Sequence, residues 1–525
     1  MPDRAAGDGD HSTNIAEHGT GDWPSTDLVA ARAASTPDRE AVVDAPSGDE
    51  WTYRDLDTWV AATADRLPEA DSPPARIGVL SRPRPEVVAL LHAAWRTGRE
   101  LVPLSTRLAP RALAAQLDRA DVDVVLADDA ATDLAADATN ALDVPEPPAV
   151  RALETVAREP AGAESPQPVD HAVSREDVPV TLFTSGSTGD PKAVRLTVGN
   201  LLSSATASAF RLGVARGDRW LSPLPTYHMG GLAPIVRCAL YGSTVVLQRE
   251  FDVDATASAL AESDATGVSL VPTALRRLVD ADWTPPGSLR FVLLGGAAAD
   301  RDLLARCESN DVPVYPTYGM TETASQIATA TPEQAFADPD TVGQPLVNTT
   351  VAVVAPDGST CPPGEEGELV VSGPTVTPGY LDAGDPEPVR DGAFSERGFR
   401  TGDRGYRDDD GLLYVTGRVD DMIVTGGENV QPVVVEDALR TLDAVEDAAV
   451  VGLPDPEWGE RVAALVVPAD DHAPGANDAD AVREAIRDRL AAHEVPKTVE
   501  FADAVPRTAS GTVDRPGVRD RLADR

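Results

Sequence analysis

The sequence predicts an α/β protein in which a large N-terminal region is followed by a small α+β domain. Its 525 residues exceed what one hydrophobic core usually supports, so two or more domains are expected. The N-terminal region alternates helical and extended patterns, and the pattern changes near residue 417. Short apolar strands that alternate with helices are typical of parallel sheets with helices on their faces.

The N-terminal pattern is clearest between residues 86 and 104. Residues 86–98 predict a helix because apolar side chains recur at helical spacing, at Val87, Val88, Leu90, Leu91 and Ala94. Residues 101–104 predict a short strand, and three further apolar runs predict buried strands at 243–247, 267–271 and 290–294. In contrast, residues 129–170 are rich in Ala, Pro and Asp, so we expect a loose surface excursion there.

The last hundred or so residues have a pattern of their own. Strands are predicted at 448–452 and 462–467, and an amphipathic helix from about Asp478 carries Val482, Ile486 and Leu490 on one face. A segment of roughly this length can form a separate domain. We therefore expect a disordered tail (1–24), an N-terminal domain (25–419) and a C-terminal lid domain (420–525).

The net charge is strongly negative, because 86 Asp and Glu residues outnumber 45 Lys and Arg residues, a balance of −41. Lysine occurs only at Lys192 and Lys497, so arginine supplies the other cations. Such a surface repels itself, and salt relieves the repulsion because the Debye length falls to roughly 3 Å at 1 M. The composition predicts a salt-loving source organism and disfavours nucleic acid or an anionic membrane as partner.

The sequence predicts neither export nor membrane insertion. No segment approaches the run of about 18 apolar residues that crosses a bilayer, and the polar N-terminus lacks the apolar stretch of a signal peptide. Cys238, Cys307 and Cys361 are scattered without metal-ligand spacing. These features predict a protein of the reducing cytoplasm.

The strongest chemical signal is a loop of small and hydroxylated residues that follows a predicted strand at 178–183. The loop consists of Thr184, Ser185, Gly186, Ser187, Thr188, Gly189, Asp190, Pro191 and Lys192. Small residues let backbone N–H groups approach an anion, hydroxyls can donate to phosphate oxygens, and Lys192 adds a positive charge. The spacing differs from the Walker pattern, and the alternative is a flexible Ser/Gly turn. The strand before the loop and the Pro-Lys pair at its end favour phosphate binding.

This loop resembles the signature of the adenylate-forming superfamily, which includes acyl-CoA synthetases, peptide-synthetase adenylation domains and luciferases. The match is complete up to the last glycine of that signature, where this chain has Ala193. Five further motifs follow in the family's order, namely PTYH (225–228), GGAA (295–298), YGMTE (318–322), FRTGD (399–403) and GRVDD (417–421). The resemblance covers about residues 25–520 and implies a multi-subdomain N-terminal region of layered sheets and helices with a small, mobile C-terminal lid.

The resemblance implies that the loop binds the nucleotide together with Gly295, Thr317, Tyr318, Gly319, Thr321, Asp403 and Arg418. It places Tyr318 against adenine and Asp403 on the ribose hydroxyls, whereas the residues alone also fit core packing and a Thr-Gly-Asp turn. Glu322 is implied as the Mg²⁺ ligand, with a helix-start carboxylate as the alternative. His228 is implied to line the acyl pocket, although a lone histidine is more often structural.

The family's reaction has two steps and uses ATP, Mg²⁺ and coenzyme A. A carboxylate attacks the α-phosphorus of ATP and pyrophosphate leaves; a thiolate then attacks the acyl carbonyl and AMP departs. The charge that grows on the phosphoryl oxygens must be stabilised, and Lys192 and Glu322 are the catalytic candidates beside His228. The resemblance also implies that the lid rotates between the steps, with Asp420 as the hinge and the loop 426–427 moving beside the thiol channel.

One departure from the family concerns its C-terminal catalytic lysine. Relatives end with Pro-Arg-x-x-x-Gly-Lys, whereas this chain has Thr512 at the lysine position of PRTASGT (506–512). A hydroxyl does not replace a full positive charge. We expect Arg515 to supply the charge, with Arg507 or Mg²⁺ alone as alternatives; Lys497 matches an ordinary family position.

Within the superfamily, the chain most resembles the 2-succinylbenzoate–CoA ligases of menaquinone biosynthesis. The resemblance rests on YHMGG (227–231), YGMTETASQ (318–326) and GGEN (426–429). The substrate of these ligases is a dianion whose succinyl carboxylate reacts, so its aromatic carboxylate needs a cationic partner. Arg237, nine positions after His228, is the candidate partner, with Ser325 and Gln326 as polar contacts; the alternative for Arg237 is a surface residue that caps a helix.

Three other functions stay open at the level of sequence. A medium-chain or aryl acyl-CoA ligase would need a longer apolar pocket and no Arg237. A carrier-loading adenylation enzyme is disfavoured because no phosphopantetheine carrier domain follows, and a catalytically weakened regulator is supported by Thr512 alone. The expected partners are a small carboxylic acid, ATP and CoA, with a homodimer as the candidate assembly.

Overall fold

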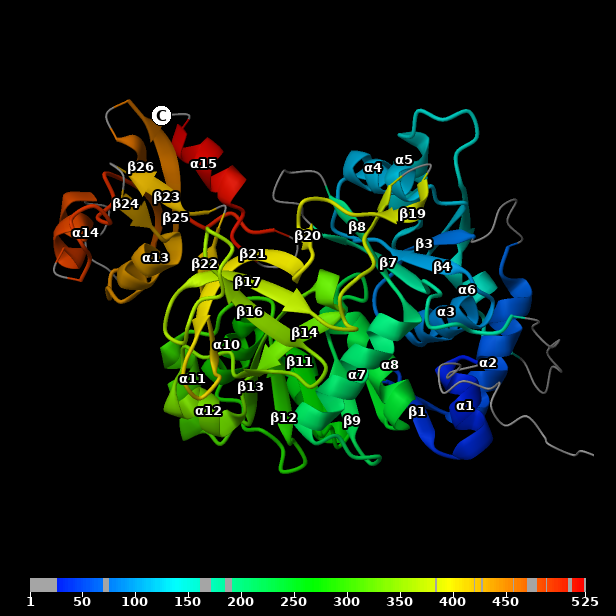
Figure 1. The fold of residues 1–525 in the computed structure, drawn as a ribbon. Coiled ribbons are helices and arrows are strands. Elements are labelled where there is room, and N and C mark those ends of the chain that lie inside the picture. The colour runs from blue at the N-terminus through cyan, green and yellow to red at the C-terminus, as the bar shows by residue number, and fades with distance from the viewer. Residues whose placement is uncertain are drawn as a thin grey trace, which may run out of the picture.

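The computed structural model describes residues 26–68, 75–160, 171–184, 191–382, 385–419, 421–425, 428–456, 458–469, 479–487, 489–508 and 512–523. Over these residues the chain forms four β-sheets with helices packed on them (Figure 1). The predicted tail, residues 1–24, lies outside the described part of the chain. The α/β fold class with a small C-terminal unit is confirmed.

The largest sheet has nine strands. From one edge to the other they are β15 (Gln344–Pro345), β14 (Ser325–Thr329), β13 (Val314–Met320), β12 (Phe291–Leu294), β11 (Gly267–Leu270), β9 (Arg219–Ser222), β10 (Thr244–Leu247), β1 (Glu40–Asp44) and β2 (Asp49–Thr52). The six strands from β13 to β1 run parallel, and the edge strands are antiparallel. Every residue of β10, β11 and β12 is buried, so the three predicted apolar strands are confirmed.

The second sheet has eight strands and carries the predicted phosphate loop. Its order is β19 (Asp385–Val389), β18 (Tyr380–Asp382), β8 (Lys192–Leu196), β7 (Val180–Thr184), β4 (Glu100–Pro103), β3 (Arg76–Leu80), β5 (Val124–Ala127) and β6 (Ala149–Ala152). Strands β18 and β19 come from a part of the chain far from β8, yet β18 pairs directly with β8. This pairing brings residues near 380 to the end of the loop.

A third, antiparallel sheet completes the N-terminal part of the molecule. It consists of β16 (Thr350–Val354), β17 (Gly367–Ser372), β21 (Gly398–Arg407), β20 (Phe394–Ser395) and β22 (Leu413–Arg418), the last paired with β21. The helices of this part are α1 (Leu28–Ser35), α2 (Tyr53–Arg66), α3 (Pro85–Arg96), α4 (Pro110–Ala120), α5 (Thr132–Asn140), α6 (Leu153–Val156), α7 (Val198–Leu212), α8 (Met229–Tyr241), α9 (Val253–Glu262), α10 (Pro272–Asp280), α11 (Arg301–Ser309), α12 (Pro332–Ala337) and the 3₁₀ turn η1 (Thr321–Thr323).

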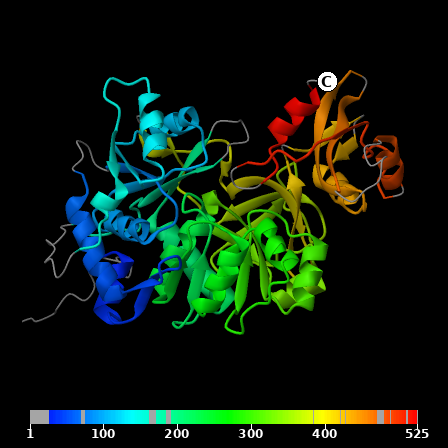
Figure 2. The same ribbon diagram turned by 180° about the vertical axis from the view of Figure 1, so that it is seen from behind.

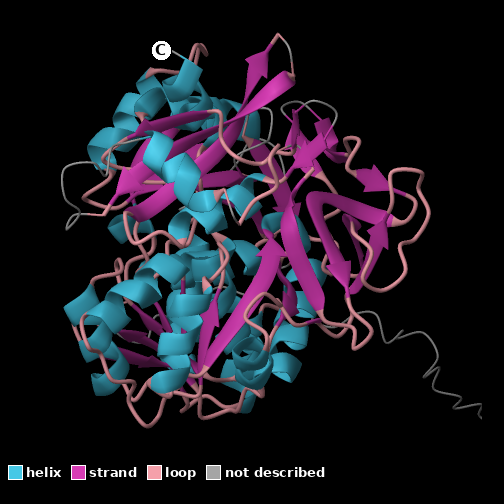
Figure 3. Cartoon of the chain, turned by 90° about the vertical axis from the view of Figure 1, so that its left-hand side faces the viewer, coloured by secondary structure: helices cyan, strands magenta, loops and turns pink. Residues whose placement is uncertain are grey.

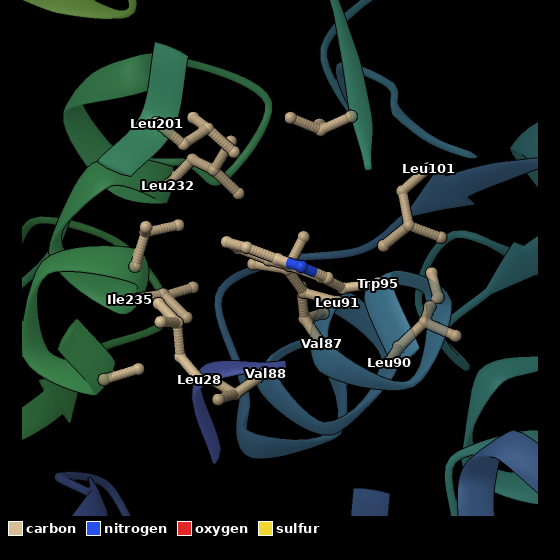
Figure 4. Close-up of a cluster of buried hydrophobic side chains, with 14 of the residues drawn as sticks. Leu28, Val87, Val88, Leu90, Leu91, Trp95, Leu101, Leu201, Leu232 and Ile235 are labelled. Carbon is tan, nitrogen blue, oxygen red and sulfur yellow. The ribbon is translucent and has the colours of Figure 1, made fainter. Parts of the chain in front are cut away.

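One hydrophobic core joins the two large sheets through α2, α3, α7 and α8. Helix α3 forms where the pattern predicts it and begins with Pro85, which is favoured in a first turn because it has no N–H to leave unpaired. Figure 4 shows Trp95 of α3 between Leu232 and Ile235 of α8 on one side and Leu101 of β4 on the other. Figure 3 shows helices on both sides of the strands, which is the layered arrangement that the sequence predicted.

The prediction of a loose excursion at residues 129–170 is wrong over its described part. Helix α5 and strand β6 form there, and β6 pairs with β5 at the edge of the second sheet. Ala131, Ala135 and Ala138 are buried in a cluster with Leu113 and Leu117 of α4. Alanine side chains let two helices pack closely but give a weak hydrophobic pattern, so the helix was missed.

Residues from Ile423 onward form a small C-terminal unit with its own sheet and core. The unit contains β24 (Glu428–Val430), β23 (Ile423–Thr425), β26 (Gly459–Pro468), β25 (Val445–Asp455), β27 (Thr498–Phe501) and the helices α13 (Pro432–Arg440), α14 (Ala479–Ile486) and α15 (Arg515–Ala523). Helix α14 buries Val482 and Ile486, as predicted, but it ends at Ile486, so the prediction of Leu490 on the same helix is wrong; Leu490 packs against this core from beyond the helix. Figures 1 and 2 both show this unit at one end of the molecule, beside the third sheet.

Two sequence-based expectations about environment can be compared with the fold. None of the described helices is long and apolar enough to cross a bilayer. Cys238, Cys307 and Cys361 are free thiols, and the first two are buried.

Candidate active site

The predicted phosphate loop connects two neighbouring strands, β7 and β8. The strands pair antiparallel with Thr184 opposite Lys192, so the two ends of the loop lie side by side. Arg119 of α4 donates to the carbonyl oxygen of Pro191 at 3.0 Å and thereby anchors the end of the loop. The rest of the loop lies outside the described residues, namely Ser185, Gly186, Ser187, Thr188, Gly189 and Asp190.

Lys192 lies in a small cluster of charged and aromatic side chains. Its ammonium is 2.7 Å from a carboxylate oxygen of Asp391 and 5.0 Å from the ring centre of Tyr380. The Tyr380 hydroxyl is in turn 3.4 Å from a carboxylate oxygen of Glu322. Lys192 and Glu322, far apart in sequence, therefore lie in the same cluster.

Glu322 sits in the 3₁₀ turn that follows β13. Partial desolvation raises the pKa of its carboxyl group, although Lys192 and Arg418 act in the opposite direction. A carboxylate whose charged form is disfavoured by its surroundings would be stabilised by a nearby cation. Nothing within the described ranges forms a group of three or more His, Cys, Asp or Glu side chains that could hold a metal ion. Glu322 therefore fits a metal that takes most of its ligands from phosphate and water, as Mg²⁺ usually does.

Asp403, Tyr318 and Arg418 are joined through the carboxylate of Asp403. The Tyr318 hydroxyl donates to one carboxylate oxygen at 2.6 Å, and Arg418 Nη1 pairs with the other at 2.9 Å. Burial raises the pKa of Asp403, while Arg418 lowers it. The structure thus brings together three of the residues that the sequence assigned to the nucleotide.

Two glycines of the predicted nucleotide site are required by close approaches of the backbone. A Cβ atom on Gly319 would lie 1.8 Å from the carbonyl oxygen of Ser325, and one on Gly295 would lie 2.8 Å from the Thr317 methyl group. The Thr317 hydroxyl donates to the Ala328 carbonyl oxygen at 2.9 Å. Thr321 begins the turn η1, where its carbonyl oxygen accepts from the N–H of Ala324 at 3.0 Å. Gly295, Thr317, Gly319 and Thr321 are therefore collected where β12 and β13 end.

Arg237, on α8, is one of the largest fully buried side chains of the protein, with 2% of its surface exposed. Its guanidinium lies 5.3 Å from the Trp220 ring centre and donates from Nη2 to the Ser325 hydroxyl at 3.2 Å. Its Nε has no hydrogen-bond partner, and no carboxylate of the described residues pairs with it. Desolvation lowers the pKa of Arg237. The alternative of a surface residue that caps a helix is excluded by this burial, and a charge buried in this way is costly without a counter-ion.

The backbone at Ser325 has an unfavourable conformation that directs its hydroxyl toward Arg237. Ala324 and Ser325 have φ angles of 52° and 114°, which L-residues with side chains rarely adopt. The hydroxyl of Ser204 donates to the Ala324 carbonyl oxygen at 2.6 Å and helps to hold the conformation. As a result the hydroxyl of Ser325 faces Arg237.

The other two predicted substrate contacts have different surroundings. His228 is the residue immediately before α8, and its ring meets the Tyr227 ring edge-on with centres 4.7 Å apart. Gln326 is buried and donates to the Thr329 hydroxyl at 2.7 Å, which itself bonds Thr317. The structure therefore connects Gln326 with Thr317, which the sequence predicts as a nucleotide contact, and no hydrogen bond found among the described residues joins Gln326 to Arg237.

The family model of AMP-binding enzymes matches residues 29–381, and the model of the AMP-binding enzyme C-terminal domain matches residues 434–512. The chain belongs to the AMP-binding enzyme family. It shares 35% identity with the 2-succinylbenzoate–CoA ligase of Bacillus licheniformis, over 92% of this chain and 97% of that protein. It shares 35% identity with the ligase of the same name from Bacillus cereus, over 94% and 98% of the two chains.

Solved structures of related enzymes agree with this membership. The o-succinylbenzoate CoA synthetase of Bacillus subtilis in complex with its acyl-adenylate intermediate superposes with a TM-score of 0.84 at 30% identity, over 95% of this chain and 98% of that one. The same synthetase in complex with ATP and magnesium ion gives a TM-score of 0.83 at 30% identity, over 95% and 99%.

In this AMP-binding enzyme, Arg515 does not lie with the other candidate catalytic residues. Its Nε donates to Asp421 at 2.9 Å, and its Nη1 donates to Glu436 and to the Val450 carbonyl oxygen, both at 2.6 Å. Burial alone would lower the pKa of Arg515, but Glu436 and Asp421 raise it. The guanidinium is thus occupied within the C-terminal unit, where it ties α15 to α13 and β25.

Replacing Arg515 by alanine is expected to destabilise the C-terminal unit by about 3 kcal/mol, because the buried carboxylate of Glu436 would lose its closest charged partner and keep only Arg440, at 3.8 Å. Calorimetric unfolding at constant high salt measures this. The matched control is Arg507→Ala, since Arg507 pairs with Asp447 at 2.6 Å in a more exposed position and should contribute less than about 1 kcal/mol. Equal unfolding temperatures for the two variants would contradict the structural role of Arg515.

Two further sequence-based assignments concern the C-terminal segment of the enzyme. Thr512 bonds Thr508 through both hydroxyls at 2.7 Å, and its carbonyl oxygen accepts from the Thr508 N–H at 2.8 Å. Lys497 lies over the Trp458 ring, 3.7 Å from its centre. The predicted hinge residue Asp420 and the loop 426–427 lie outside the described residues.

Sequence reasoning missed two members of the site, Tyr380 and Asp391. Neither belongs to the motifs quoted above, and Asp391 lies 199 residues from Lys192 in the chain. The pairing of β18 with β8 carries Tyr380 to Lys192. Only the pairing of distant strands could have indicated them.

Proposed function

We propose that this protein is an ATP-dependent acid–thiol ligase that converts 2-succinylbenzoate into 2-succinylbenzoyl-CoA and releases AMP and pyrophosphate. Relatives that carry the name 2-succinylbenzoate–CoA ligase match more than nine-tenths of the chain. The observation that carries the choice of acid is the buried guanidinium of Arg237, which has no carboxylate partner among the described residues.

Arg237 fits the second carboxylate of the substrate. 2-Succinylbenzoate carries an aromatic carboxylate that does not react, and a fully desolvated guanidinium can hold it through charge-assisted hydrogen bonds. Ser325 adds a hydroxyl beside the guanidinium. His228, which precedes the same helix, would line the acyl pocket and help to place the reacting succinyl carboxylate. A monocarboxylic acid would leave Arg237 buried without a counter-ion.

The nucleotide fits the two clusters on either side of the turn η1. Asp403, supported by Arg418, would bind the ribose hydroxyls, and Tyr318 with the glycine segments 295–296 and 319 would receive the adenine. Lys192 and the loop 184–192 would bind the phosphates. Glu322 would hold Mg²⁺, which neutralises charge on the phosphate oxygens when bound.

The reaction then proceeds in two steps. The succinyl carboxylate attacks the α-phosphorus, a new P–O bond forms, and the bond to pyrophosphate breaks. The thiolate of CoA next attacks the acyl carbonyl, and AMP leaves with the electrons of the acyl–oxygen bond. Lys192 and backbone N–H groups of the loop would stabilise the charge that develops in the first step.

A panel of acids in ATP–pyrophosphate exchange tests the proposal. In high salt, 2-succinylbenzoate is expected to support exchange at least tenfold better, on the order of 1.4 kcal/mol or more, than benzoate, octanoate or acetate. Preference for octanoate would favour a medium-chain acyl-CoA ligase and would sink the assignment. No exchange with any acid would favour a nucleotide-binding regulator, for which Thr512 in place of the family lysine is the one supporting observation.

The cellular setting and the moving parts belong to the same proposal. The charge of −41 supports a salt-rich cytoplasm, and scattered free cysteines support a reducing one. We place the boundary of the lid domain at residue 420, and Asp420 as the hinge. The N–H of Val419 donates to the carbonyl oxygen of Gly402 in the large domain, whereas the carboxylate of Asp421 accepts from Arg515 in the C-terminal unit. This change of partner on either side of residue 420 supports a hinge there.

A further inference from the structure

Asp391 holds Lys192 with a carboxylate that is itself fixed in place. One oxygen pairs with the ammonium of Lys192 at 2.7 Å, and the other accepts from the N–H of Ala393 at 2.9 Å. Asp391 lies in the short connection between β19 and β20, and this connection follows β18, which pairs with β8. The side chains of Lys192 and Asp391 are 29% and 36% exposed, so an incoming anion can reach the pair.

Lys192 is therefore oriented before any phosphate arrives. Its ammonium is held between Asp391 and the face of the Tyr380 ring, whose hydroxyl contacts Glu322. A flexible lysine side chain otherwise samples many rotamers, and holding it costs entropy that a ligand would have to supply. At the same time, the carboxylate occupies one of the hydrogen-bonding positions of the ammonium that a phosphate oxygen could otherwise take.

We propose that Asp391 is a positioning residue that acts through Lys192: it aligns the ammonium for the triphosphate and lowers the affinity of the site for ATP and pyrophosphate. The inference rests on the proposed role of Lys192 in phosphate binding. A phosphate on Lys192 must displace the carboxylate or share the ammonium with it, and in both cases the like charges repel. Pyrophosphate is held through its phosphate oxygens alone, so the repulsion acts on the whole of its binding, whereas ATP also binds through its base and ribose.

The repulsion explains why a carboxylate is useful in a phosphate site. A site built only of cations and N–H donors would bind pyrophosphate tightly and release it slowly, which limits turnover in many enzymes. Because the pair is partly exposed, salt screens it, and the effect of Asp391 must shrink as the salt concentration rises.

The test compares Asp391→Asn with the parent protein. Asparagine keeps the size of the side chain and the oxygen that accepts from Ala393, but it loses the negative charge. The equilibrium dissociation constants of ATP and of pyrophosphate, measured by calorimetry at low salt, are expected to fall about two- to fivefold. The KM for ATP should fall with them, while kcat falls because pyrophosphate leaves more slowly. Asp391→Glu, which restores a carboxylate, should return the constants toward those of the parent.

The matched control is Glu396→Gln, at an exposed position directly after β20. It removes one negative charge from the same stretch of the chain and should leave both dissociation constants within the error of the parent. Unchanged or weaker pyrophosphate binding in Asp391→Asn, or an equal gain in Glu396→Gln, would overturn the inference. Binding of pyrophosphate needs no acid substrate, so this test is independent of the acid panel. If no acid supported exchange but Asp391→Asn still bound pyrophosphate more tightly, only the proposed ligase activity would be contradicted. Parent-like ATP binding by Lys192→Met would instead contradict the phosphate-binding role.

Discussion

Glu322→Gln is expected to be more stable than the parent at neutral pH and nearly inactive. The surroundings of Glu322 raise its pKa, mainly through desolvation, so the ionised carboxylate costs stability in the folded protein without its cation. Glutamine keeps the shape and removes the charge. It also removes the carboxylate proposed to hold Mg²⁺, and ATP–pyrophosphate exchange should fall on the order of a hundredfold or more.

The pH dependence of stability separates this cause from a general loss of negative charge. A raised folded-state pKa means that the parent has its full stability below the unfolded pKa of 4.5 and loses stability as the pH rises through the folded value. The unfolding midpoints of the two proteins should therefore agree below that pH and separate above it. Glu396→Gln, at an exposed position, is the control for charge removal from this acidic protein. A parent-like exchange rate in Glu322→Gln would rule out the proposed metal ligand.

Arg237→Met is expected to lower kcat/KM for 2-succinylbenzoate by about a hundredfold or more, because the aromatic carboxylate would lose its charged partner in a desolvated pocket. Exchange with octanoate or benzoate should be unchanged or better, since these acids have no second carboxylate to pair. The unliganded variant should also unfold at a higher temperature, because a buried charge without a counter-ion has been removed.

Arg211→Met, on the adjacent helix α7, is the matched control for Arg237→Met. Arg211 is partly desolvated and donates to the Gln344 carbonyl oxygen at 3.3 Å. It should leave the ranking of acids unchanged. If Arg237→Met kept the parent preference for 2-succinylbenzoate, the second carboxylate would have to be recognised elsewhere.

Sequence patterns predicted the buried parallel strands and the α3 helix because these elements repeat apolar residues at regular spacing. The pattern failed at α5, where alanine fills the contact with α4. The departure at Thr512 made Arg515 a catalytic candidate, and sequence position could not reveal that Asp421, Glu436 and the Val450 carbonyl oxygen already bond its guanidinium.

The residues of the candidate site could be predicted where they belong to short contiguous sequence motifs. Tyr318, Asp403 and Arg418 came from three motifs, and the structure joins them through one carboxylate. Asp391 could not be predicted, because its partner is reached only through the pairing of distant strands. The positive φ of Ser325 was also hidden, since a sequence carries no mark of a strained backbone at a residue other than glycine.

Because lysine is so scarce, the few lysine side chains of this protein can be labelled and followed individually. Its two lysine side chains lie in separate parts of the molecule, Lys192 against Asp391 in the phosphate cluster and Lys497 against Trp458 in the C-terminal unit. An amine-directed reagent therefore labels only two lysine peptides. An anion that covers Lys192 shields one of them and leaves the other as an internal reference. Occupancy of the proposed phosphate site can thus be followed by mass spectrometry in the unmodified sequence.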